Sequence, residues 1–141
     1  RLASMDDAWP YKGKTDYLFP QSHGYQYKGY YLNSKKRPTF MYEYGSIKIE
    51  DFFEDHLNDN GKAFFTRTVT FTTTAKQEPF FFRLGSGKEI KKNGTSWHID
   101  RLSLGLHEDM KILIREGDTK DLLLPVQLSK GKTIIKIDYK W

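Results

Sequence analysis

Hydrophobic and polar residues alternate with a period of two along most of the chain from residue 24 onward. The clearest case is the segment AFFTRTVTFTTT (63–74), in which Phe65, Val69 and Phe71 alternate with threonines. This pattern is typical of β-strands that have one buried and one solvent-facing side. No stretch keeps a helical period for more than about one turn, so we expect an all-β chain.

Turn signals divide the alternating region into about nine or ten short strands. They include NSKKRP (33–38), NDNG (58–61) and SKGK (129–132), which are rich in residues that favour turns. Strands at this spacing predict an antiparallel β-sandwich of a jelly-roll-like kind. Within it, PFFFRL (79–84) is apolar on both sides and predicts a central strand, whereas Pro125 predicts an edge strand or a bulge.

Tyrosines are concentrated in GYQYKGYYL (24–32) and in the strand that follows it. Strict alternation places Tyr25, Tyr27 and Tyr31 on one face of the first strand and Tyr30 on the other. Two interpretations are open. The rings form the core, or they form an exposed platform on which a sugar or a nucleobase stacks. We expect most of them to be core and a minority, such as Tyr30 with a tryptophan, to be exposed. The candidate ligand-binding residues are Tyr30, Trp9, Trp97, Arg37 and Tyr42.

Composition excludes several classes of site. The chain has 141 residues and no cysteine, which excludes disulfides, thiolate catalysis and covalent haem attachment. Its net charge of +5 permits an anionic partner, but the lysines are scattered, with one cluster at Lys35–Arg37. No apolar run approaches the ~20 residues that a membrane-spanning helix needs. We expect one domain over residues 24–141, preceded by an irregular lead-in over residues 1–23 that packs on it.

Oxygen-bearing side chains gather around the predicted turn at residues 58–61. Asp55, Asn58 and Asp59 are candidate calcium ligands, and an ordinary hairpin turn explains them equally well. Asp51 and Asp55 lie about 13 Å apart along a strand, which is too far for the two carboxyl groups of a glycosidase. The histidines are dispersed, which does not favour a transition-metal site. We therefore expect no cofactor, with calcium as the one option.

Two segments, YKGYYLNSKKRPTFMYEYGSIKIEDFF (27–53) and LPVQLSKGKTIIKIDYKW (124–141), resemble a known kind of β-sandwich. It occurs in large exported bacterial proteins that also carry c-type cytochrome regions and propellers similar to quinoprotein sugar dehydrogenases. The resemblance covers residues 24–84 and 121–141. It implies a secreted or periplasmic accessory domain and transfers no catalytic residue. The chain lacks the C-x-x-C-H haem signature, so redox activity would lie elsewhere in such a protein.

From these observations we predict a non-catalytic binding or accessory module, related to carbohydrates, within a larger exported redox or polysaccharide-processing protein. One alternative is a small β-sandwich lyase or hydrolase in which Tyr30, His98 and Arg101 converge, because β-elimination needs a base near a cation. The other is a barrel that binds single-stranded nucleic acid, suggested by the pI of 9.3 and the aromatic residues. The expected partners are a glycan or other domains of the parent protein, and nucleic acid is not favoured.

Overall fold

The structure is a computed structural model that describes residues 4–7 and 24–141. The lead-in expected over residues 1–23 lies almost entirely outside the described residues. The described part contains eleven β-strands and no helix, where the sequence predicted nine or ten strands. The strands are β1 (Tyr25–Leu32), β2 (Pro38–Tyr44), β3 (Ile47–Leu57), β4 (Ala63–Thr73), β5 (Phe80–Gly87), β6 (Ile90–Asn93), β7 (Ser96–Ile99), β8 (Leu102–Leu106), β9 (Leu113–Arg115), β10 (Lys120–Val126) and β11 (Gly131–Lys140).

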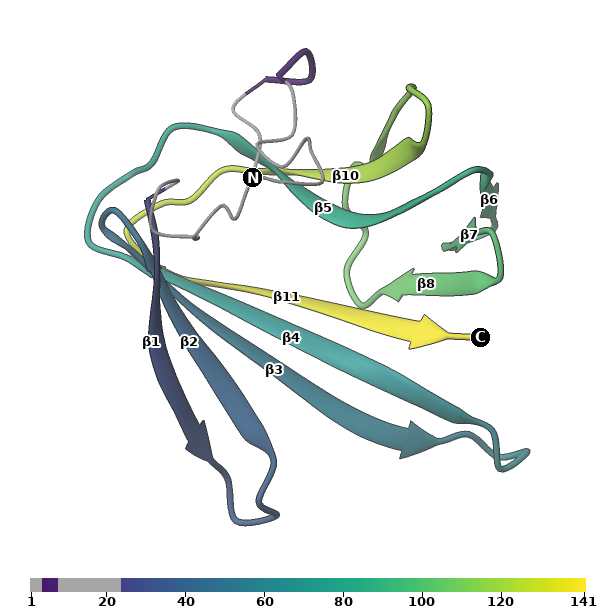
Figure 1. The fold of residues 1–141 in the computed structure, drawn as a ribbon, viewed down its shortest axis with the longest axis horizontal. Coiled ribbons are helices and arrows are strands. Elements are labelled where there is room, and N and C mark those ends of the chain that lie inside the picture. Colours follow the sequence, from purple (N-terminus) through teal and green to yellow (C-terminus); the bar gives the residue numbers. More distant parts are fainter. Residues whose placement is uncertain (1–3, 8–23) are drawn as a thin grey trace, which may run out of the picture.

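The strands form two antiparallel sheets of unequal size, which confirms the all-β sandwich predicted from the alternation. The larger sheet has the order β1-β2-β3-β4-β11-β8-β7-β6, and the smaller has the order β5-β10-β9. In Figure 1 the strands β1 to β4 fan away from β5 and β10. The large sheet ends in the edge strands β1 and β6, so it does not close into the barrel that the nucleic-acid alternative requires.

One face of the large sheet, which we refer to as its inner face, packs against the small sheet. The register places Ile47 and Phe53 on the inner face of β3, as the alternation predicted. The core lies between the sheets, where the ring of Phe71 contacts the rings of Phe80 and Phe82 at 5.8 and 6.0 Å. The most completely buried side chains are Val69, Leu104, Leu122, Leu123, Leu124, Leu128, Ile135 and Ile137.

The pairing of β1 with β2 contains a β-bulge between Tyr27 and Gly29. One extra residue in β1 shifts the alternation, so that Tyr30 rather than Tyr31 follows Tyr25 and Tyr27 on the inner face. The faces predicted for Tyr30 and Tyr31 are therefore wrong. Gly29 has a φ of 103°, which L-residues rarely adopt, and it supplies the backbone conformation that the bulge needs.

The expectation that most of these tyrosines are core is also wrong. Tyr27, Tyr30 and Tyr31 are exposed by 54, 57 and 48%, and Tyr25 and Tyr44 are half-buried. The physical reason is the position of β1 at the edge of the sheet, where a ring has a neighbouring strand on one side only. Periodicity identifies which residues share a face, but not whether a second sheet lies over it.

In the small sheet, β5 is an edge strand rather than the central strand predicted from PFFFRL. Its apolar character comes from burial against the large sheet, since Phe80 and Leu84 are buried. Pro125 lies in β10 opposite Phe81, beyond the point where β9 stops pairing with β10. β10 is nevertheless the middle strand of the small sheet, and its bulge lies between Leu122 and Leu123, so the edge strand or bulge predicted from Pro125 is wrong. The proline is tolerated because its own position has a neighbouring strand on one side only.

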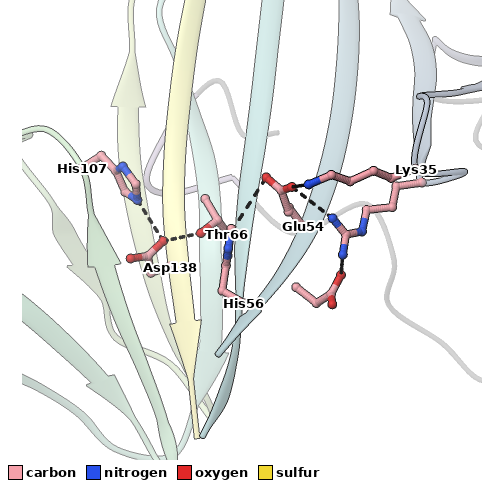
Figure 2. A network of polar contacts seen from close by, with 8 residues as sticks. Lys35, Glu54, His56, Thr66, His107 and Asp138 are labelled. Atoms are coloured by element: carbon pink, nitrogen blue, oxygen red, sulfur yellow. Dashed lines mark hydrogen bonds and ion pairs between the residues drawn. The ribbon is translucent and has the colours of Figure 1, made fainter. Parts of the chain in front are cut away.

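The outer face of the large sheet carries a network of polar contacts (Figure 2). Asp138 on β11 accepts a hydrogen bond from Thr66 on β4 at 2.7 Å and lies 2.8 Å from Nε2 of His107. Burial raises the pKa of Asp138, but the hydrogen bonds from His107 and Thr66 outweigh burial and lower the pKa below its usual value. Nearer to β1, the guanidinium of Arg37 contacts Glu54 on β3 at 3.1 Å.

Candidate functional site

The inner face extends beyond the part that the small sheet covers. Among the described residues, nine large apolar side chains are exposed, and seven of them lie on this extension. The ring of Trp141, which follows β11, joins the extension through its contact with Phe65 at 5.5 Å. We refer to these seven as the open inner face: Tyr27, Tyr30, Leu32, Phe53, Leu57, Phe65 and Trp141. Apolar side chains gathered in this way usually mark a binding surface.

Rings on neighbouring strands of this face stand against one another. Tyr27 contacts Tyr42 with 5.5 Å between ring centroids, and Tyr30 contacts Phe40 at 6.2 Å. Both pairs lie directly opposite in the register of β1 and β2. Cross-strand ring pairs of this kind stabilise a sheet and limit the motion of each ring. The rings of Tyr27 and Tyr30 are therefore held in place by their neighbours on β2.

A charged pair lies between the open inner face and the covered core. Arg67 on β4 donates two hydrogen bonds to Asp51 on β3, from Nε to Oδ1 at 2.9 Å and from Nη2 to Oδ2 at 2.7 Å. The guanidinium carbon lies 5.2 Å from the ring centroid of Phe53 and 5.3 Å from that of Phe82. The side chains of Arg67 and Asp51 keep 23 and 15% exposure, so the pair is partly open to solvent.

This pair affects the ionisation of the polar groups around it. Burial lowers the pKa of Arg67, but the hydrogen bond and charge of Asp51 outweigh burial and raise it. Burial raises the pKa of Tyr42, and the negative charge of Asp51 adds to this effect. Burial also raises the pKa of Tyr139, against the opposing charge of Arg67. Both phenols therefore stay protonated at neutral pH and keep hydroxyl groups that donate and accept hydrogen bonds.

A cavity of about 310 Å³ lies where the open inner face meets the core. Phe80 and Phe82 of β5 form one wall, and residues of β1 to β4 form the others. Among the described residues that line it, Asp51 and Arg67 are charged, and the others are tyrosines, phenylalanines and aliphatic side chains. Concave sites for small molecules usually combine apolar walls with a few well-placed polar groups.

Two of the candidate ligand-binding residues belong to this site. Tyr30 lies on the open inner face, and Tyr42 lines the cavity. Arg37 lies just before β2, where its guanidinium pairs with Glu54 and Asp55 on β3 at 3.1 and 2.5 Å. These ion pairs fasten the β1–β2 turn to the neighbouring strand. Arg37 is therefore engaged in a structural contact at the rim of the site.

The candidate tryptophans are not brought to this site. Trp97 lies on β7, near the opposite edge of the large sheet from β1, and packs against the core. The ammonium group of Lys92 lies 5.6 Å from the centroid of its ring. Trp9 lies outside the described residues. The tryptophan that the structure places on the open inner face is Trp141, next to Phe65.

Two of the three calcium candidates, Asp55 and Asn58, have other partners in the structure, and Asp59 is an exposed residue of the same turn. Asp55 forms the ion pair with Arg37. Oδ1 of Asn58 accepts hydrogen bonds from the backbone N–H groups of Asn60 and Lys62 at 3.0 and 2.9 Å, so it closes the turn between β3 and β4. No cluster of three or more histidine, aspartate or glutamate side chains suited to a metal ion occurs within residues 4–7 and 24–141.

The residues of the lyase alternative do not converge. Tyr30 lies on the inner face of β1, at one edge of the large sheet. His98 lies on β7 toward the other edge, and it occupies the outer face because its neighbour Trp97 pairs with the buried Leu104. Arg101 lies in the turn between β7 and β8. The groove that this alternative requires is therefore not formed by these three residues.

Reasoning from the sequence missed Asp51 and Arg67 as members of the site. Both occupy inner-face positions in strands whose other inner residues are mostly apolar. When two strands joined by a short turn carry opposite charges at inward positions, the two side chains are expected to form an ion pair, because an unpaired charge is costly to bury. Such a pair has a structural or a functional role. That signal was present in the alternation, because Asp51 shares its face with Ile49 and Phe53, and Arg67 shares its face with Val69.

In comparisons with known proteins, no family model, curated protein or solved structure shows significant similarity to this chain. Within the described residues, no helix is long and apolar enough to cross a membrane. The geometry of the open inner face and of the Asp51–Arg67 pair is therefore the basis on which a function is assigned.

Proposed function

We propose that this chain is a non-catalytic carbohydrate-binding module that binds a glycan on the open inner face. The observation that carries the proposal concerns the described residues: seven of their nine exposed large apolar side chains lie on one face of one sheet. A soluble protein rarely keeps so many rings exposed together without a binding role. The resemblance of residues 27–53 and 124–141 supports an accessory role within a larger exported polysaccharide-processing or redox protein.

The mixture of rings and hydrogen-bonding groups favours a sugar over a purely apolar ligand. A pyranose ring presents C–H groups on its faces and hydroxyl groups around its edge. Tyr27 and Tyr30 offer ring surface to the faces, and the Asp51–Arg67 pair offers acceptors and donors to the hydroxyls. An apolar peptide or lipid would leave this charged pair without a match, which costs binding free energy.

The proposal is tested by native affinity electrophoresis of the chain through gels that contain single soluble polysaccharides. Retardation by at least one polysaccharide is expected, and Tyr30→Ala is expected to weaken it by about tenfold or more, the loss typical of a central aromatic contact. Tyr31→Ala is the matched control, because Tyr31 is the next residue and is similarly exposed at 48%, but lies on the outer face.

Two outcomes would contradict the proposal. The first is that no polysaccharide in a broad panel retards the protein. The second is that Tyr31→Ala weakens retardation as much as Tyr30→Ala does, since binding would then not depend on the inner face. Tyr31 donates a hydrogen bond to Glu50 at 3.1 Å, so a Tyr31→Phe variant separates the loss of this bond from the loss of the ring.

A further inference from the structure

We infer that the ligand of the open inner face is an uncharged polysaccharide, held along the interior of its chain, whose hydroxyl groups are recognised by the Asp51–Arg67 pair. The inference rests on the proposed function and adds to it the charge of the ligand, the way it lies, and the residues that select it. It is carried by the distribution of charge over the two faces of the large sheet, by the geometry of the pair and by the extent of the exposed face.

The lysines of β3 and β11 lie on the face opposite the open inner face, whereas Lys35 and Arg37 in the β1–β2 turn lie at its rim, where both pair with Glu54. The register of β1 to β4 and β11 places three charged residues on the inner face, namely Asp51, Asp55 and Arg67. Arg67 is paired with Asp51, and Asp55 is paired with Arg37 at the rim. Each charged residue on the face is therefore paired with an opposite charge, although the chain as a whole carries a net charge of +5.

The lysines of the same strands occupy the outer face. Lys48 on β3 and Lys132 on β11 both lie opposite Thr72, which belongs to the threonine row of β4. Lys136 lies opposite Thr68 in the same row. An anionic polymer, whether nucleic acid or an acidic glycan, needs cations where it lies. In β3, β4 and β11 the cations other than Arg67 lie on the outer face, whereas the exposed rings lie on the inner face.

The Asp51–Arg67 pair suits hydroxyl groups better than it suits an anion. Arg67 has five N–H donors, of which two bind Asp51, and its side chain also interacts with the hydroxyl group of Tyr139. The carboxylate of Asp51 retains further lone pairs. Two adjacent sugar hydroxyls can donate to Asp51 and accept from Arg67 at the same time, without a net change in charge. A carboxylate or sulfate on the ligand would approach Arg67 only beside the negative charge of Asp51, which is repulsive.

The extent of the face favours a polymer over a single sugar. From β1 to β11 the face crosses four intervals between adjacent strands, which is roughly 19 Å at the usual spacing of strands in a sheet. Exposed rings occur at both ends of this distance, with Tyr30 on β1 and Trp141 after β11. Because β1 is an edge strand, the described chain does not extend past the rings on that side. A face that is open at this edge suits an internal stretch of a polysaccharide, which continues beyond the residues that bind it.

The inference is tested with two sets of polysaccharides in affinity electrophoresis. The neutral set contains hydroxyethyl cellulose, xyloglucan, galactomannan and laminarin, and the anionic set contains carboxymethyl cellulose, polygalacturonate and alginate. We expect retardation by at least one neutral polymer and by none of the anionic ones. The retardation is expected to change by less than about twofold when salt is raised from about 50 to about 500 mM, because no counterions are released on binding.

The outcomes separate the inference from the proposed function. Preferential binding of anionic polymers that weakens with salt, and that is lost in Tyr30→Ala, would overturn the inference and leave a glycan-binding function intact. Failure of every polymer in both sets to bind would overturn the proposed function. Calorimetry with glucose, mannose, galactose and xylose tests whether a single sugar is sufficient for binding. If a monosaccharide binds as tightly as the polymer, the inference that the protein binds the interior of a polysaccharide chain is overturned.

The role of the pair is tested by two substitutions. Arg67→Lys keeps the positive charge but cannot form the bidentate hydrogen bonds to Asp51, and Asp51→Asn keeps the size of the side chain but loses its negative charge. Each is expected to weaken binding of the retained neutral polymer by about tenfold, with Tyr31→Ala unchanged. Circular dichroism and the thermal midpoint report on folding, and Arg67→Lys decides the question if Asp51→Asn does not fold. Unchanged affinity in a folded Arg67→Lys variant would overturn recognition by the pair.

Discussion

The inner face of the large sheet has two halves, which differ in the kind of apolar side chain they use. The half that the small sheet covers is mainly aliphatic, with Ile47, Val69, Leu104, Ile135 and Ile137 all buried. The half that extends beyond it is mainly aromatic, with Tyr27, Tyr30, Phe53, Phe65 and Trp141 all exposed. Both halves follow the same period of two. They differ because the small sheet covers one half only. The other half is in contact with water, which favours apolar side chains that also have a polar group.

The aromatic half gains little folding free energy from its position. Removing apolar surface from water contributes roughly 25 cal/mol per Å², and rings that keep about half of their surface exposed contribute correspondingly less. Tyrosine and tryptophan tolerate partial exposure, because each has a polar group that water can satisfy. Stability therefore explains the aliphatic half, whereas the exposure of the aromatic half is the reason for proposing that it binds a ligand.

Substitutions in the two halves give the largest contrast. Ile137→Ala removes a side chain with 0% exposure and is expected to lower the free energy of unfolding by about 2–5 kcal/mol. Leu57→Ala removes a side chain of the same face with 72% exposure and is expected to change it by less than about 0.5 kcal/mol. Urea unfolding followed by tryptophan fluorescence measures both values. Similar losses for the two variants would contradict the conclusion that the covered half contributes far more to stability than the exposed half.

The border between the halves gives the next effect. Asp51→Ala leaves the partly buried guanidinium of Arg67 without its two hydrogen-bond acceptors, and we expect a loss of about 1–3 kcal/mol in the free energy of unfolding. The double variant with Arg67→Ala should recover part of this loss, because no unpaired charge remains. A double-mutant cycle measures the coupling, and a coupling energy near zero would show that the pair does not act as a unit.

The bulge in β1 gives a smaller effect, which links stability to the open half. Gly29→Ala forces a side chain onto a residue with a φ of 103°, and we expect a loss of about 1 kcal/mol with weaker polysaccharide retardation. Gly105→Ala on β8 is the matched control, since that residue has no positive φ and an added Cβ meets nothing within 4 Å. Equal behaviour of the two variants would show that the bulge does not position the rings.

The smallest effect is expected on the outer face, at Asp138. Because hydrogen bonds lower the pKa of its carboxyl group in the folded protein, the associated stability is fully present above the ordinary pKa of 3.8 and is lost as pH falls through the lowered pKa. The contribution is less than about 1 kcal/mol for so exposed a pair with His107. Urea unfolding of the protein and of Asp138→Asn at about pH 5 and about pH 3 measures it. A decline of the same size in both would contradict it.

The alternation in the sequence was sufficient to predict most of the fold. It assigned β3 and β4 correctly, including the inward positions of Phe53 and Val69. It could not predict that β5 lies at an edge, because burial on both sides of a short strand arises equally from a partner strand or from a packed sheet. The division into eight and three strands depends on pairing between distant segments, such as β4 with β11, which no local pattern records.

The candidate site was predicted only in part. Tyr30 was correctly singled out as exposed, but on the wrong face, because an extra residue at a bulge changes every later position in the strand. Trp97 was expected at the platform, yet it packs against the core at the far side of the sheet. The error at Trp97 has a different cause from the error at Tyr30. Which half of a face is covered depends on where the second sheet ends, and this is decided by the whole fold.

The bulge between Tyr27 and Gly29 also bears on how the protein behaves at high concentration. A regular edge strand offers a row of backbone donors and acceptors to which a strand of another molecule can add, and this is a common route to aggregation. In β1 that row is interrupted, and Lys28, paired with Glu43 at 3.3 Å, places a charge at the interruption. The bulge that places Tyr30 on the inner face therefore also makes β1 less able to pair with the same strand of another molecule.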